Sequence, residues 1–246
     1  MSNIDYTIIG NDMQLVDIAL TPSQGVRSEV GAMMYMEDDI DMHTSSGGLV
    51  KGIKRIFTKE GFFITTFENK GTTTQHIAFG APYPGKIVPL ELSRFDNELK
   101  VQKDAFLCAE AGVEIDICLN KKIGTGIFGG EGFIMQNLKG PGLAFIHAGG
   151  TIIEKQLNDQ ETLRVDTGCV VGLEKTVDFD IKFVGGVRNA LFGGEGLFFA
   201  LLRGPGTVYL QSLPFSRLAD RINAVTHLRN SKGEQGGLRG FFTGDH

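Results

Sequence analysis

The 246-residue sequence contains no tryptophan and only three cysteines, Cys108, Cys118 and Cys169. An odd number of cysteines without metal-type spacing argues against a disulfide framework and favours a reducing compartment. No run approaches the roughly 18 apolar residues typical of a membrane-spanning helix. The first residues also lack the basic and apolar regions of a secretory signal. The sequence alone therefore predicts a cytoplasmic protein without a transmembrane segment.

Positive charge is not in excess either. The chain has 24 Lys and Arg against 29 Asp and Glu, a formal net charge of -5. An acidic surface gives no long-range attraction to nucleic-acid phosphates or anionic lipids. The short basic clusters at 51–55 and 121–122 are typical of solvated loops. The composition therefore argues against nucleic acid as a partner.

Catalytic motifs are missing as well. The histidines form no His-x-His or His-Glu-x-x-His pattern, and the chain has no Gly-x-Ser-x-Gly elbow, P-loop or Cys-x-x-Cys pair. Gly124, Gly126 and Gly129 match the dinucleotide fingerprint, but a Gly-rich segment and then a strand-like one follow where a helix is required. We therefore predict no catalytic residue, cofactor or metal ligand, and leave open whether the protein is an enzyme.

What the chain does contain is internal repetition. The segment 99–142 recurs 64 residues later as 163–206. Both copies contain an alternating apolar and polar stretch, 113–117 and 177–181, which predicts a half-buried strand. A weaker third copy precedes them, in which Val30-Gly-Ala corresponds to Val101-Gln-Lys. The pattern of short strands and 34 glycines predicts an all-β fold.

Two glycine-rich motifs punctuate the copies and are predicted to be structural turns. The turn residues are Gly129, Gly130, Glu131, Gly132, Gly193, Gly194, Glu195, Gly196, and the Gly-Pro-Gly residues Gly140, Gly142, Gly204 and Gly206. Glu60, Glu131 and Glu195 share one position in the three copies. Such a glutamate accepts hydrogen bonds from turn amides, and the alternative is a carboxylate set for metal or acid–base chemistry.

The repeat divides the chain into four segments. Residues 1–87, 88–151 and 152–213 are predicted to be three β-sandwich units, and 214–246 a short helix with a Gly-rich tail. Leu218, Ile222 and Val225 are spaced for one helical stripe, and Ser216 is the expected N-cap. His147 corresponds to Gln211, which predicts a solvent-facing or interfacial strand position.

The glycine turns, the Gly-Pro-Gly connections and the segment 81–87 together resemble bacterial relatives of the altered-inheritance-of-mitochondria family of β-domain proteins, over residues 5 to about 222. The resemblance implies three tandem β-sandwich units similar to the tryptophan-RNA-binding attenuation protein, a short variant of the double-stranded β-helix. It also implies a homotrimer whose nine units form a ring. It transfers no catalytic residue, and Thr58 and Lys59 depart from the Gly-Gly of the motif.

Three functions follow as hypotheses. The first is a non-enzymatic assembly, scaffold or interaction protein that forms a closed trimeric ring and binds a protein partner whose identity the sequence does not reveal. The second is a cupin-like protein that binds a metal or small ligand, which the missing His-x-His argues against. The third is an RNA-binding ring, which the acidic charge argues against.

Overall fold

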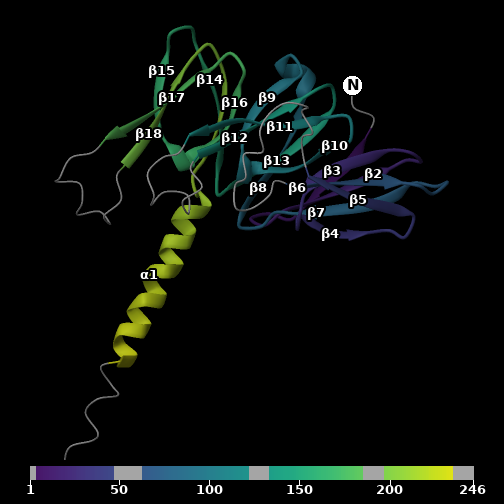
Figure 1. Ribbon diagram of the computed structural model, residues 1–246, viewed down its shortest axis with the longest axis horizontal. Coiled ribbons are helices and arrows are strands. Elements are labelled where there is room, and N and C mark those ends of the chain that lie inside the picture. The colour runs from purple at the N-terminus through teal and green to yellow at the C-terminus, as the bar shows by residue number, and fades with distance from the viewer. Residues whose placement is uncertain (1–3, 47–62, 122–132, 185–196, 235–246) are drawn as a thin grey trace, which may run out of the picture.

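The computed structural model describes residues 4–46, 63–121, 133–184 and 197–234. Within these ranges, nineteen strands form four antiparallel sheets, and a single α-helix, α1 (Phe215–Glu234), follows the last strand. The chain is therefore all-β with a C-terminal helix, as the strand and turn patterns predict. In Figure 1 the helix projects away from the sheets.

Sheets A and B contain the N-terminal strands, in the orders β1-β2-β7-β4 and β5-β6-β3-β10-β13-β8. Sheet A comprises β1 (Asp5–Ile9), β2 (Leu15–Leu20), β4 (Met33–Met36) and β7 (Gln75–Gly80). Sheet B comprises β3 (Gly25–Glu29), β5 (Ile40–Ser46), β6 (Phe63–Asn69), β8 (Gly85–Glu91), β10 (Phe106–Glu110) and β13 (Leu143–Gly149).

Sheets C and D follow, in the orders β11-β12-β9-β16-β19-β14 and β15-β18-β17. Sheet C comprises β9 (Glu98–Gln102), β11 (Glu114–Lys121), β12 (Phe133–Lys139), β14 (Ile152–Leu157), β16 (Val170–Glu174) and β19 (Gly206–Gln211). Sheet D comprises β15 (Thr162–Asp166), β17 (Asp178–Val184) and β18 (Leu197–Arg203). Short 3-10 helices are η1 (Leu92–Phe95), η2 (Lys103–Ala105) and η4 (Thr167–Cys169).

One strand arrangement recurs along the chain. We define set 1 as β2–β7, set 2 as β8–β13 and set 3 as β14–β19. In each set the first, sixth and third strands are neighbours in one sheet, and the second, fifth and fourth are neighbours in another. The third strand also shifts register at the same place in every set, between Met33 and Tyr35, Phe106 and Cys108, and Val170 and Gly172. These shifts align the three sets residue by residue.

The sheets stack in the order A, B, C, D, because one hydrophobic cluster lies between each adjacent pair. Cluster AB joins β2 and β7 to sheet B and includes Ile18, Phe79 and Phe145. Cluster BC lies between sheets B and C and includes Phe106, Ile146 and Tyr209. Cluster CD lies between sheets C and D and includes Met135, Val165 and Leu202. Sheets B and C are therefore covered on both faces.

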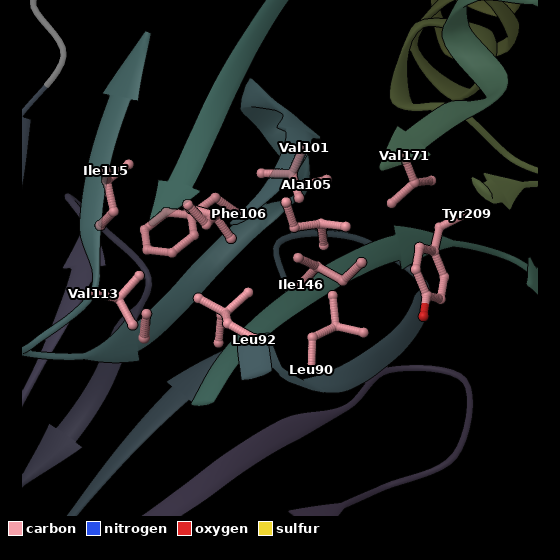
Figure 2. Packing of buried hydrophobic residues seen from close by; sticks show 14 of the residues in the cluster. Leu90, Leu92, Val101, Ala105, Phe106, Val113, Ile115, Ile146, Val171 and Tyr209 are labelled. Carbon is pink, nitrogen blue, oxygen red and sulfur yellow. The ribbon is translucent and has the colours of Figure 1, made fainter. Parts of the chain in front are cut away.

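Local sequence explains these positions. In β2, Val16, Ile18 and Leu20 are fully buried in cluster AB, whereas the alternate residues Asp17 and Ala19 face outward. In β13 every residue is buried, because both faces of sheet B are covered. Figure 2 shows how cluster BC is completed by set 3, since Val171 and Tyr209 lie beside side chains of set 2.

Two details differ from the sequence predictions. The helix begins at Phe215, directly after Pro214, so Ser216 lies within its first turn and is not its N-cap. The strand pairs also place Ser28, not Val30, at the position of Val101, because Ser28 faces Cys108 of set 2 as Val101 faces Gly172 of set 3. The structural equivalence is therefore shifted by two residues from the one that the sequence suggests.

Candidate assembly interface

The sets are joined by pairing between one strand of each set and one strand of the next. In sheet B, β3 of set 1 pairs with β10 of set 2, and in sheet C, β9 of set 2 pairs with β16 of set 3. Both junctions therefore join the second strand of one set to the third strand of the following set. The two sheets are continuous across these junctions.

The same rule leaves two strand edges open within the part of the chain that the structure describes. β15, the second strand of set 3, is at the edge of sheet D, and β4, the third strand of set 1, is at the edge of sheet A. Sheet D thus has the strands that begin sheets B and C, and β4, β7 and β2 of sheet A correspond to the strands that end them. An unpaired edge exposes backbone N–H and C=O groups that can pair with another chain.

The outer face of sheet A is the counterpart of faces that are buried elsewhere. Phe145 in set 2 and Tyr209 in set 3 occupy the position of Ala78 in set 1, and both aromatic rings are 1% exposed. Phe145 packs in cluster AB and Tyr209 in cluster BC, each against the preceding set. In set 1 the aromatic residue beside Ala78 is Tyr35 on β4, which is 46% exposed.

A polar network covers this outer face. Tyr35 donates a hydrogen bond from its hydroxyl to Oδ2 of Asp17, and Nδ1 of His76 lies 2.6 Å from Oδ1 of the same carboxylate. The hydrogen bond to Asp17 raises the pKa of His76 and also that of the Tyr35 phenol. The backbone N–H of His76 donates to Oε2 of Glu37 at 2.8 Å. The three strands β2, β4 and β7 therefore hold one connected set of titratable groups beside the open β4 edge.

The described residues offer little for metal or thiol chemistry. Among residues 4–46, 63–121, 133–184 and 197–234, no group of three or more His, Cys, Asp or Glu side chains could hold a metal ion. The three cysteines are free, and burial raises the pKa of the Cys108 thiol well above its ordinary value. A raised pKa disfavours the reactive thiolate, so Cys108 acts as a packing residue in cluster AB.

A buried histidine lies at the opposite end of the strands from the Gly-Pro-Gly turns. His147 is 1% exposed, and neither ring nitrogen has a hydrogen-bond partner among the described residues. The Tyr83 ring packs edge-on at 4.4 Å between centroids. Burial lowers the pKa of His147 from 6.5 to about 4. Gln211, at the same place in set 3, is also buried, so the position is interfacial and not solvent-facing.

Replacing His147 with glutamine is expected to flatten the acid side of the stability profile. The fold holds the imidazole neutral, so the wild type loses stability as pH falls from 6.5 to about 4, by about 2 kcal/mol at pH 5 from this group. Glutamine does not titrate, and Gln211 shows it can bond there, accepting from Gly149 N and donating to Gly168 O. Chemical denaturation at pH 7.5 and 5 measures the difference. An unchanged pH dependence in the variant would contradict this assignment.

The structure places the predicted turn residues in two groups. Gly129–Gly132 and Gly193–Gly196, with their glutamates, lie outside the described residues, as does Glu60. The Gly-Pro-Gly residues connect β12 to β13 and β18 to β19. Gly142 and Gly206 both have φ of +138°, and a Cβ on Gly206 would lie 2.5 Å from the Thr176 hydroxyl. These two positions therefore require glycine.

Sequence reasoning missed a second glutamate that all three sets share. Glu37 directly follows the third strand of set 1, and Glu110 and Glu174 are the last residues of the third strands of sets 2 and 3. The carbonyl of each glutamate accepts the N–H of the residue three positions on. The carboxylate of Glu174 also accepts the Thr207 N–H at 2.8 Å, as that of Glu37 accepts the His76 N–H. The 64-residue spacing of Glu110 and Glu174 was the available signal. In sets 1 and 3 this carboxylate ties the end of the third strand to the sixth strand.

Within the described residues, no helix has the length and apolarity that crossing a bilayer requires. The exposed side chains of α1 include Phe215, Ile222 and Val225.

Comparisons with known proteins agree with one another. A family model described as mitochondrial biogenesis AIM24 matches residues 6–213. An uncharacterized protein of Streptococcus pyogenes serotype M6 is 28% identical over 218 residues, which cover 85% of each chain. A crystal structure of a Streptococcus pyogenes protein, a structural genomics target, aligns with a TM-score of 0.71 and 24% identity over 91% of this chain and 100% of that one. The last comparison shows that the fold is shared.

Proposed function

Because the chain belongs to the mitochondrial biogenesis AIM24 family, and because its described sheets end in two unmatched strand edges, we propose that it is a non-enzymatic assembly and scaffold protein. In this proposal, residues 1–87, 88–151 and 152–213 are three tandem β-sandwich units, and three chains close into a cytoplasmic ring of nine units. The ring presents a surface for a further protein partner.

The observation that carries this proposal is the pair of unmatched strand edges. Both internal junctions join a second strand to a third strand. Within the described residues, one second strand, β15, and one third strand, β4, have no such partner. These edges lie on different parts of the chain, so copies that pair through them associate head to tail. Head-to-tail contacts form a closed ring when the rotation between copies closes, and a filament when it does not. The family resemblance described in the sequence analysis implies closure at three chains.

Native mass spectrometry of the purified protein tests the proposal. We expect a trimer at micromolar concentration without a bound small molecule. A stable monomer would overturn the assembly, because both edges would then be exposed in the functional form. A stoichiometric metal or small ligand would overturn the non-enzymatic scaffold and favour the ligand-binding alternative. Salt-sensitive binding of RNA, measured on the same preparation, would overturn it in favour of an RNA-binding ring.

A further inference from the structure

The strands of sheets A and D correspond to the two halves of one six-stranded sheet such as B or C. Sheets B and C each contain three strands of one set followed by three strands of the next set. The second strand of the first set pairs with the third strand of the next set where the two halves meet. Sheet D contains only the first half, β17-β18-β15, and sheet A contains only the second half, β4-β7-β2, with β1 added. Their open edges are those that meet inside sheets B and C.

We propose that β15 of one copy pairs antiparallel with β4 of a second copy, with Val165 opposite Tyr35, Arg164 opposite Met36 and Leu163 opposite Glu37. This inference rests on the proposed self-assembly and adds the strands, the register and the side chains that make the contact. The joined sheet has the order β1-β2-β7-β4-β15-β18-β17, with the last three strands from the other copy.

The register follows from the two junctions that the chain itself contains. Ser28 faces Cys108 at the first junction, and Val101 faces Gly172 at the second. Pairing with the fifth strand of each set places Val165 at the position of Ser28 and Val101. Val165 faces Ala200, Ser28 faces Thr65 and Val101 faces Gln136, and these three partners occupy the same position in their sets. The register shift in the third strand places Tyr35 at the position of Cys108 and Gly172.

Burial supports the same face. Ser28 and Cys108 are both fully buried, in the interior that set 1 shares with sheet B. Val165 belongs to cluster CD, where Leu163 and Phe179 remain only partly buried. In the joined sheet, Tyr35 of the second copy lies on the side of Val165, so its ring covers the open side of cluster CD. Its hydroxyl keeps a partner in that position, because Asp17 already accepts its hydrogen bond.

One side chain across the first junction gives a further contact. Arg27 on β3 donates from Nη1 to the carbonyl oxygen of Val113 in the next set, at 3.1 Å. Arg164 occupies the position of Arg27 in the strand pairs. Ile40 occupies the position of Val113, because the N–H of Ile40 donates to the Glu37 carbonyl as the N–H of Val113 donates to the Glu110 carbonyl. Arg164 therefore reaches the Ile40 carbonyl of the second copy in the proposed register.

Disulfide cross-linking tests this register. The background is the full chain with Cys118→Ser and Cys169→Ala, in which the buried Cys108 is retained. Tyr35→Cys with Val165→Cys is expected to give covalent dimers and trimers on a non-reducing denaturing gel after mild oxidation, because directly opposite residues are within about 4.5–5.5 Å. The pair Met36→Cys with Arg164→Cys leaves the buried Val165 intact, because Arg164 is exposed, and repeats the test if the first variant does not fold.

The matched control shifts the register by two residues. Tyr35→Cys with Leu163→Cys places the cysteines diagonally, about 7–8 Å apart, which is beyond ordinary disulfide reach. Covalent trimers from the two in-register pairs, with at least tenfold less from the control, support the inference. Equal cross-linking of the control, or a trimer by native mass spectrometry without cross-links in either in-register pair, overturns the inference and leaves the proposed assembly standing. Monomers of the uncross-linked background overturn the assembly itself.

Discussion

Replacing Phe145 with alanine is expected to lower the free energy of unfolding by about 3–5 kcal/mol. The ring is 1% exposed and packs in cluster AB, where Tyr6 contacts it edge-on at 4.9 Å between centroids. Phe145 lies on β13 in sheet B and faces the interior of set 1, so its removal leaves a cavity between two sets. Chemical denaturation followed by circular dichroism, at one fixed protein concentration, measures the loss.

The control for Phe145 is an apolar side chain of the same sheet system that faces solvent. Ile153 on β14 is 53% exposed, and its replacement by alanine is expected to change stability by less than about 0.5 kcal/mol. If Phe145→Ala lowered the free energy of unfolding as little as Ile153→Ala, cluster AB would have relaxed around the cavity. That result would contradict the view that set 1 and set 2 share one close-packed interior.

The second large effect is expected at Glu29, where glutamine should stabilise the protein above pH 7. Oε1 of Glu29 accepts a hydrogen bond from Nε2 of Gln136 at 3.2 Å, across the junction of sets 1 and 2. Burial raises the pKa of Glu29 from 4.5 to about 7, the nearby Asp104 adds to the rise, and the Gln136 bond and Lys103 oppose it. The fold therefore prefers the protonated carboxyl.

The sign of the pH effect follows directly. Below pH 4.5 the carboxyl is neutral in both folded and unfolded chains, so its full contribution to stability is present. Between pH 4.5 and about 7 only the unfolded chain ionises, and stability falls by about 3 kcal/mol from this group. Glu29→Gln removes that loss, so the variant should exceed the wild type at pH 8 by more than it does at pH 4.5. An equal difference at both pH values would contradict the raised pKa.

Local pattern predicted the strands well where one face or both faces are covered by neighbours. Phe133 and Met135 on β12 form a continuous apolar run with Ile134, and all three are buried, because sheet C lies between two clusters. The alternation in 113–117 also predicted a strand, but Ile117 is 44% exposed. It lies on the edge strand β11, next to a register shift.

The candidate interface was beyond the reach of pattern. Tyr35, Asp17 and His76 come from three strands, and only the sheet brings them together. The pairs β3–β10 and β9–β16 join segments about 70–85 residues apart, and no local periodicity encodes such partners. The repeat nevertheless contained part of this information. Once two junctions are known, the equivalence of the sets specifies the third.

The shared interiors also bear on how the three sets diverged in sequence. A side chain such as Phe145 or Tyr209 must fit the set to which it belongs and the set that precedes it, so a change there is constrained from both sides. The outer layer of set 1 has no preceding set within its own chain, and Ala78, beside Tyr35, takes the place of those large rings. The N-terminal copy, which matches the other two weakly, is thus the one whose outer layer meets no preceding set of the same chain.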